Sequence, residues 1–537
     1  MPPVIQQRLH QTRGNAPALP GRSNADLVDE QLRRLVGMLH HDARGNADNN
    51  TIRTIRARHK HHMVLRVQKI ARPDRINRIV KNILRHMVQN RHIGRAQLHD
   101  LNCGLHTASA LGKPAKTCSI TPRKVKTGQT LMKLRDLDVF VVGTPPGTWG
   151  GRYFIFVKVT TDTGIVGYGE VYAAAVGPVA QSAVIEDVFA RHMAGEPPDA
   201  IEKMFRRAYS SGFTQRPDPT VMGAFSGLEM ACWDIVGKAL DRPVHALLGG
   251  LVNDRLRAYS YIYPFAGQDH DPATFFSHPD KLAESAARMA DDGYTAVKFD
   301  PAGPYTIWGG HQPALYDLDR SEACCKAIRE AVGNRADLLF GTHGQFTTSG
   351  AARLARRIEP YDPLWFEEPC PPDNLLEFGT VARQTCIPVA TGERLTTKAE
   401  FATLLRSGGA AILQPALGRV GGILEAKKIA AMAEAFNAQL APHLYAGPIE
   451  WAANVQLAAC IPNALLVETI ETAFHRSLVD TPMLVENGHI RVPTGPGLGV
   501  ALNEDVARAH PYAGDRLHLE MVDTPYSYGS ETWFAGG

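Results

Sequence analysis

The sequence predicts an α/β fold in which a (β/α)8-type barrel follows a small α+β unit. Short β-type runs, each followed by a helical stretch, recur after residue 257 of the 537-residue chain. Residues near the ends of these runs are evenly spaced, since Gly341, Glu367 and Glu393 lie 26 positions apart and His443 and Glu468 lie 25 apart. An open doubly wound sheet is the weaker alternative, because the sequence has no GxGxxG or GxxxxGK phosphate loop.

The first 131 residues differ in composition from the rest of the chain. They hold 24 Lys+Arg against 7 Asp+Glu and no aromatic residue, whereas the remaining 406 residues hold 34 against 47 and all 40 Phe, Trp and Tyr. A highly charged segment without aromatics buries too little surface to offset its ordering entropy. We expect residues 1–131 to be a disordered tail or organelle-type leader, or to be extraneous to the natural protein, and we favour a natural start at Met132.

Composition also excludes several classes of function. Nucleic-acid binding is disfavoured, because the basic residues lie in the segment that has no aromatic core. No run of 18 apolar residues occurs and no apolar stretch follows the first methionine, so we expect neither a membrane span nor a secretory signal. Eight cysteines without a CxxC pair are typical of reduced thiols, which predicts a cytoplasmic protein.

The α+β unit is expected over residues 132–257. It opens with three segments that alternate apolar and polar side chains, and Asp162, Thr163 and Gly164 form a hairpin turn between the second and the third. Helical patterns follow from about residue 177 to 240. The expected strands are 133–142, 153–160 and 164–172.

The barrel is expected over residues 258–490. Its predicted strands are 258–265, 295–300, 337–342, 364–367, 387–393, 411–417, 439–445 and 465–470. In such barrels the reactive side chains lie at the C-terminal ends of the strands. These ends are unusually polar here and supply Lys298, Asp300, His343, Glu367, Glu393, His443 and Glu468.

Carboxylates that converge from neighbouring strands repel one another unless a hard dication lies between them. Oxygen ligands suit Mg²⁺, so Glu367 and Glu393 are candidate metal ligands. A metal with a Lys and a His on opposite sides suits removal of a proton next to a carboxylate, since the metal stabilises the enediolate. Lys298, His343 and His443 are therefore candidate catalytic residues.

Each candidate also has a structural alternative. In this alternative, Glu393 forms an ion pair with Arg394 and has no metal role, and Lys298 forms a structural ion pair with Asp300. His443 can be a hydrogen-bonded loop residue, and His343 an acid or base, a ligand or a bystander. Glu468 can contact His443, the substrate or a salt-bridge partner at the barrel rim.

Further motifs resemble the mandelate racemase branch of the enolase superfamily, over about residues 132–514. A segment at 224–249 (AFSGLEMACWDIVGKALDRPVHALLG) matches the signature of the family, with Cys232 outside the usual choice. The other matches are WFEEP at 365–369, IPVATGER at 387–394, Gln414-Pro415, Gly421-Gly422, APH at 441–443 and PGLG at 496–499. ATGER, APH and Gly447-Pro448 resemble acid-sugar dehydratases, galactonate dehydratase in particular.

The resemblance implies that the α+β unit and residues 491–537 form a capping domain over a barrel that holds Mg²⁺. It implies that Glu367 and Glu393 are metal ligands, that His443 is the base and that His343 assists departure of hydroxide. Glu468 matches the glutamate of the eighth strand. The resemblance also implies a homo-oligomer.

Two positions depart from the family pattern. The first metal ligand falls on Gly341, and we expect Asp300 to replace it, with His343 as second choice. The aspartate that normally orients the seventh-strand histidine falls on Ala416, which would lower the basicity of His443.

We therefore expect a Mg²⁺-dependent lyase that dehydrates a sugar acid to a 2-keto-3-deoxy acid. His343 or Lys298 would protonate the leaving hydroxyl, and Trp149, Arg394 and Trp308 would bind the small-molecule substrate. A racemase, epimerase or cycloisomerase shares the enediolate step. A barrel that has lost catalysis and binds sugar acids is the alternative from another class.

Overall fold

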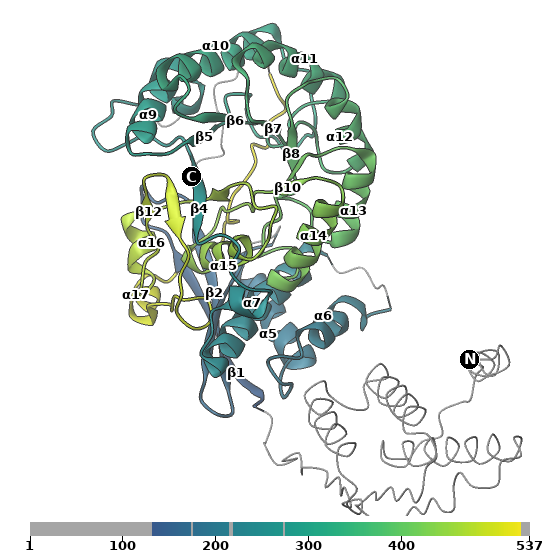
Figure 1. The fold of residues 1–537 in the computed structure, drawn as a ribbon, viewed down its shortest axis with the longest axis vertical. Coiled ribbons are helices and arrows are strands. Elements are labelled where there is room, and N and C mark those ends of the chain that lie inside the picture. The colour runs from purple at the N-terminus through teal and green to yellow at the C-terminus, as the bar shows by residue number, and fades with distance from the viewer. Residues whose placement is uncertain (1–131, 173–175, 214–217, 272–273, 528–537) are drawn as a thin grey trace, which may run out of the picture. The chain divides into compact units, whose positions relative to one another are not determined.

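The computed structural model describes residues 132–527, apart from 173–175, 214–217 and 272–273 (Figure 1). The expectations for residues 1–131 lie outside the described residues. Within the described part of the chain, no helix is both long and apolar enough to cross a membrane. The six cysteines in this part are free thiols, and all but Cys386 are buried.

The chain first forms an antiparallel sheet with helices packed beside it. The strands are β1 (Leu134–Gly143), β2 (Tyr153–Thr161) and β3 (Val166–Val171), and β2 lies between the other two. The helices are α5 (Pro178–His192), α6 (Ile201–Ser210), α7 (Pro219–Leu240) and α8 (Val244–Leu247). Asp218 caps α7 by accepting a hydrogen bond from the Val221 N–H.

Helix α7 lies directly against β3 because glycines remove the side chains between them. A Cβ on Gly169 would lie 1.8 Å from the Gly227 carbonyl oxygen, and one on Gly227 would lie 2.5 Å from Val171 Cγ2. Only glycine allows backbones to approach this closely. The close contact fixes β3, whose last residues reach the barrel.

The second part is a closed barrel of eight parallel strands, which confirms the predicted fold class. Its strands are β4 (Arg255–Tyr261), β5 (Ala296–Phe299), β6 (Asp337–Gly341), β7 (Trp365–Glu367), β8 (Val389–Thr391), β9 (Ile412–Leu413), β10 (Gln439–Leu440) and β11 (Val467–Glu468). They pair in chain order, and β11 pairs with β4. Leu440 bridges Ala464 just before β11, which closes the remaining gap.

Helices follow the strands and form an arc outside them (Figure 1). They are α9 (Pro279–Asp291), α10 (Leu315–Val332), α11 (Thr348–Ile358), α12 (Leu375–Ala382), α13 (Lys398–Ser407), α14 (Ile423–Ala435), α15 (Pro448–Ala459) and α16 (Ala473–Ser477). Two 3-10 turns are added, η1 (Phe275–Ser277) and η2 (Glu359–Tyr361).

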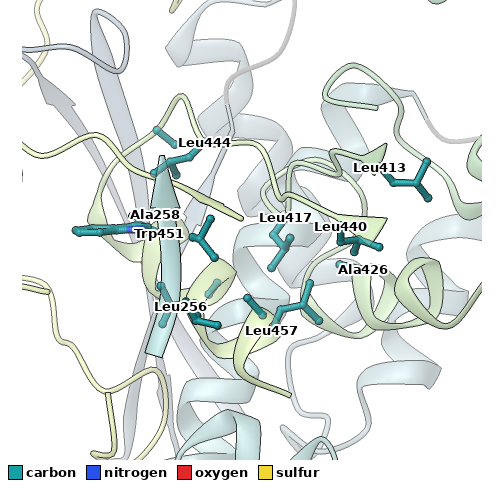
Figure 2. Packing of buried hydrophobic residues seen from close by; sticks show 14 of the residues in the cluster. Leu256, Ala258, Leu413, Leu417, Ala426, Leu440, Leu444, Trp451 and Leu457 are labelled. Carbon is teal, nitrogen blue, oxygen red and sulfur yellow. The ribbon is translucent and has the colours of Figure 1, made fainter. Parts of the chain in front are cut away.

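The barrel interior is filled by one layer of side chains to which every strand region contributes. The layer consists of Tyr259, Ala296, Leu339, Trp365, Ala390, Ile412, Ala441 and Leu466. Outside the barrel, Leu256 and Ala258 of β4 and Leu440 of β10 pack toward helices α14 and α15 (Figure 2). The packed interior leaves the C-terminal mouth as the place for polar side chains.

The C-terminal segment contacts both parts of the molecule. A hairpin of β12 (Val485–Glu486) and β13 (His489–Arg491) pairs with β4. Helix α17 (Glu504–Ala509) follows, and the Tyr512 N–H then donates to the Val141 carbonyl of β1.

The tail beyond Tyr512 reaches two loops, which are defined here as the capping loop (residues 144–151) and the barrel loop (residues 301–317). On the capping loop, His518 Nε2 lies 2.8 Å from the Gly150 carbonyl oxygen. On the barrel loop, the Val522 N–H donates to the Tyr305 carbonyl at 2.7 Å.

Candidate active site

Five charged side chains meet at the C-terminal mouth of the barrel. Lys298 comes from β5, Glu367 from β7 and Glu468 from β11, whereas Glu393 and His443 follow β8 and β10. Lys298 Nζ lies 2.5 Å from Glu367 Oε1 and 3.4 Å from Glu468 Oε1. His443 Nδ1 lies 3.1 Å from Glu468 Oε2 and 3.4 Å from Glu393 Oε2. All five side chains are less than one tenth exposed, so this group is a buried charge network.

Burial and neighbouring charges set the ionisation of this network in opposite directions. Burial raises the pKa of Glu367, and the nearby Glu393 raises it further against the effect of Lys298. Glu468 is equally buried, but Lys298 and His443 lower its pKa to about 2. Burial would also raise the pKa of Glu393, but His443, His343 and Lys298 hold it below its usual value. Glu393 and Glu468 therefore carry negative charge within the site.

His443 retains strong basicity although Ala416 removes the usual orienting aspartate. Burial lowers the pKa of His443, but Glu393 and Glu468 outweigh burial and raise it above its usual value. The expectation of reduced basicity is therefore wrong. The pKa of His443 is raised because Glu468 of β11 places a carboxylate beside Nδ1, which position 416 does not supply.

A second group lies beside this network and joins β5 to the end of β6. His343 Nδ1 lies 2.6 Å from Asp300 Oδ2, and the Tyr305 hydroxyl donates to the same oxygen at 2.5 Å. Asp300 Oδ1 accepts from the Ala302 N–H. Burial lowers the pKa of His343, but Asp300 and Glu393 raise it above the usual value. The structural alternative of a Lys298–Asp300 pair is not what forms, because the two residues take different partners.

The predicted substrate-binding residues are placed differently. The Arg394 guanidinium donates to Glu368 Oε2 at 2.7 and 2.5 Å, so it pairs with Glu368 and not with the adjacent Glu393. Trp149 stacks on Tyr263 with ring centroids 4.4 Å apart. Trp308 is 61% exposed, and its Nε1 donates to the Asp523 carbonyl.

The sequence analysis missed several residues around the site. Glu368 holds Arg394 and contacts Thr391, which only its place beside Glu367 could have suggested. The rings of Tyr172 and His443 have centroids 6.0 Å apart. Arg419 packs on the same tyrosine, with its Cζ 4.3 Å from the Tyr172 ring centroid. No sequence motif identifies Tyr172 or Tyr305, because their neighbours are distant in the chain.

The site offers oxygen donors of the type that magnesium prefers. Glu367 Oε2 and Glu393 Oε2 are buried and accept no hydrogen bond within the described structure. Unpaired carboxylate oxygens in a buried site are costly unless a cation is bound. The two glutamates therefore fit a dication. Among the described residues, no cluster of three or more His, Cys, Asp or Glu side chains is arranged to hold a metal.

Comparison with known families agrees with this geometry. A family model described as "Mandelate racemase / muconate lactonizing enzyme, N-terminal domain" matches residues 139–249. A second family model, described as "Enolase C-terminal domain-like", matches residues 281–506. A D-xylonate dehydratase of Haloferax volcanii is 35% identical over 378 residues, covering 69% of this chain and 88% of that protein. This chain belongs to the mandelate racemase/muconate lactonizing enzyme family of the enolase superfamily.

Other members of the family extend the comparison. A D-galactonate dehydratase of Pectobacterium atrosepticum is 34% identical over 361 residues, covering 66% of this chain and 90% of that protein. A solved mandelate racemase/muconate lactonizing enzyme from Sulfitobacter sp. is 66% identical with a TM-score of 0.73, covering 74% of this chain and all of that one. The expectation of a carbon–oxygen lyase is confirmed at the level of these dehydratase relatives, and the family assignment from motifs is confirmed as well.

Proposed function

We propose that this enzyme is an acid-sugar dehydratase that converts an aldonic or related acid to a 2-keto-3-deoxy acid. The observation that carries the proposal is the buried network in which Lys298, His443 and three glutamates meet at the barrel mouth. The activity of the xylonate and galactonate dehydratases supports the same reaction class.

His443 is placed to remove the proton next to the substrate carboxylate. Its two carboxylate partners both lie at Nδ1, so Nε2 is the nitrogen that takes the proton. A raised pKa makes this imidazole a stronger proton acceptor. Glu468 accepts a hydrogen bond from the Leu444 N–H as well, which fixes the carboxylate that orients His443.

His343 is the proposed acid for the leaving hydroxyl, and Lys298 is the alternative. His343 is the more accessible of the two, with a side chain that is 24% exposed against 1% for Lys298. Lys298 lies between Glu367 and Glu468, where we infer that its main role is a fixed positive charge.

Magnesium is the proposed cofactor, and Glu367 and Glu393 would hold it through the oxygens that accept no hydrogen bond. When bound, it supplies positive charge that stabilises the deprotonated substrate. Asp300 remains the sequence-based proposal for a further ligand. Its carboxylate lies near Gly341, but both of its oxygens already accept hydrogen bonds.

Several finer assignments stay predictions. Trp149 and Trp308 are proposed walls of the substrate site, while Arg394 has less support because Glu368 holds its guanidinium. A homo-oligomer and a cytoplasmic location remain predictions from the sequence and the family resemblance.

A screen of sugar acids with added Mg²⁺ tests the proposal. We expect a 2-keto product, detected as its semicarbazone, from at least one aldonic acid, and no product from the His443→Asn variant. Proton exchange or inversion without elimination would support a racemase or epimerase instead. Binding of sugar acids without turnover or bound metal would support the non-catalytic barrel.

A further inference from the structure

We propose that Asp300 and Tyr305 are positioning residues that hold His343 to protonate the leaving hydroxyl, an inference that rests on the proposed dehydratase function. The two residues form a short chain of hydrogen bonds that ends on the His343 ring. At the other histidine of the site, His443, the carboxylate beside Nδ1 comes from Glu468.

The Asp300 carboxylate is fully engaged by this arrangement. Its Oδ1 accepts from the Ala302 N–H at 3.0 Å, and its Oδ2 lies within 2.6 Å of both the Tyr305 hydroxyl and His343 Nδ1. Asp300 is 1% exposed, so water does not compete for these contacts. A carboxylate bound to Nδ1 fixes the tautomer and the orientation of an imidazole and leaves Nε2 for the substrate.

Asp300 lies beside Gly341, the position at which the family pattern has a carboxylate. A Cβ built on Gly341 would lie 3.5 Å from Asp300 Cβ and 3.7 Å from Asp300 Oδ2, which are ordinary van der Waals distances. Asp300 therefore brings a carboxylate from the neighbouring β5 strand next to this position, and there it contacts His343.

The backbone of His343 is held in an unusual conformation that needs support. Its φ is 45°, in the left-handed region that a non-glycine residue rarely adopts. Gln345 Nε2 donates to the His343 carbonyl, and the Gly344 N–H donates to the Glu368 carbonyl. Such strain persists only where surrounding contacts enforce it, and it directs the His343 ring toward Asp300.

Tyr305 is itself fixed by the C-terminal tail. The Val522 N–H donates to the Tyr305 carbonyl, and the Ile307 N–H donates to the Val522 carbonyl. The Tyr305 ring also lies against the His343 ring, with centroids 4.3 Å apart. Tyr305 therefore sets both the hydrogen bond to Asp300 and the packing of the imidazole.

The proposed step balances without a further reactant. His443 takes the α-proton, and the electrons of the broken C–H bond move into the carboxylate to give the enediolate. These electrons then form a double bond between Cα and Cβ. The Cβ–O bond breaks with its electron pair on oxygen, and the proton on His343 Nε2 joins that oxygen to give water. The enol product then becomes the 2-keto acid.

Separate measurements of proton exchange and elimination test the role of Asp300. In D₂O with Mg²⁺ and the best sugar acid from the screen, Asp300→Asn should lose elimination by at least about 10²-fold, the lower range for loss of general acid catalysis. Deuterium uptake at Cα in recovered substrate should stay within a few-fold of the unchanged protein, since His443 is intact. KM should change little.

Opposite outcomes separate this role from metal binding. If Asp300 is a metal ligand, exchange, elimination and bound Mg²⁺ will fall together in Asp300→Asn, and the positioning role is overturned. Unchanged elimination also overturns it. If the unmodified protein turns over no sugar acid, the proposed function itself fails.

Tyr305→Phe provides a second test that removes a single hydroxyl. We expect the same shift toward exchange, but smaller than for Asp300→Asn, because Asp300 keeps its bond to His343. Tyr168→Phe is the matched control, since it removes a tyrosine–carboxylate bond between β3 and Glu504 of α17. An equal effect of the two tyrosine variants on the ratio of exchange to elimination would contradict the proposal.

Discussion

Two groups of buried carboxylates in this molecule differ in what their oxygens contact. Where the α+β unit meets the barrel, Glu170 accepts from the Gly447 and Glu450 N–H groups, and Glu229 accepts from the Ile423 and Leu424 N–H groups. At the barrel mouth, Glu367 and Glu393 face Lys298 and His443 and each keeps one oxygen without a hydrogen bond.

The difference shows how burial alone fails to identify a reactive carboxylate. Glu170 and Glu229 contact backbone amides at the N-terminal ends of α15 and α14, and burial raises the pKa of each to about 8. At the mouth, nearby cations lower the pKa of Glu468 to about 2. Carboxylates that accept hydrogen bonds from main-chain amides connect secondary-structure elements. Carboxylates that contact a lysine or a histidine can instead take part in metal binding or proton transfer.

The largest test of this comparison is Glu367→Gln at the mouth. We expect activity to fall by at least about 10³-fold, since a charge that stabilises the transition state is removed. The midpoint of thermal unfolding should stay within a few degrees, because glutamine has the same shape and Lys298 keeps its ion pair with Glu468. Kinetics on the best sugar acid and a melting curve on the same sample check both parts. A large loss of stability would place Glu367 with the structural group.

Glu229→Ala tests the other group. The change leaves the Ile423 and Leu424 N–H groups buried without an acceptor, and each such group costs about 1–3 kcal/mol. We expect denaturant unfolding to show a loss of about 3 kcal/mol, while kcat per folded molecule stays near that of the unchanged protein. A fall in kcat at full folding would show that Glu229 also affects the mouth. Asp187→Ala, which removes an exposed ion pair on α5, is the control.

The pH dependence of stability should separate the groups most finely. Carboxyls with raised pKa bind a proton when folded, so their contribution is complete below the ordinary pKa of 4.5 and is lost as pH rises. For Glu170 and Glu229 the loss runs to about pH 8, and for Glu450 to about pH 7. The free energy of unfolding should fall by about 1.4 kcal/mol per pH unit for each such group.

The mouth group predicts the opposite slope at lower pH. Glu468 contributes stability that is present above pH 4.5 and lost as pH falls toward 2. Denaturant titrations between about pH 4.5 and 5.5 on the unchanged protein and on Glu229→Ala test the first slope. His475 and His518, whose pKa burial lowers to about 4, contribute the opposite slope equally to both proteins, and the mouth histidines stay charged in both states. Repeating the titrations in Glu367→Gln removes the contribution of its raised pKa. A slope that is the same in the unchanged protein and in Glu229→Ala would contradict the raised pKa of Glu229.

The barrel could be predicted because its evidence is local and periodic. The spacing of 26 residues from Gly341 to Glu367 and of 25 from His443 to Glu468 follows the repeat of strand and helix, and the structure puts Gly341, Glu367 and Glu468 at the ends of β6, β7 and β11. Predicted strands were longer than those observed, as with 411–417 against β9 at Ile412–Leu413. The polar residues at the mouth continue the alternation of apolar and polar side chains, but several of them lie in the loops that follow the strands.

Contacts within the site were harder to predict, because the partner of each charged side chain comes from a different strand. Alternation placed Lys298 and Asp300 on one side of β5, but it could not show that Glu367 and Glu468 take Lys298 while His343 takes Asp300. The missing aspartate at Ala416 predicted a weaker base. Sequence spacing does not show that Glu468, on a different strand, reaches the same imidazole nitrogen.

The tail that follows Tyr512 has a practical consequence for engineering. His518 holds the capping loop and Val522 holds the barrel loop, so two regions from different parts of the chain depend on a few late residues. Exchanging residues 513–526 between relatives would move both loops together. Because Trp149 and Trp308 on these loops are proposed walls of the substrate site, we expect such chimaeras to change substrate preference, and we expect a fusion joined within this stretch to disturb both loops.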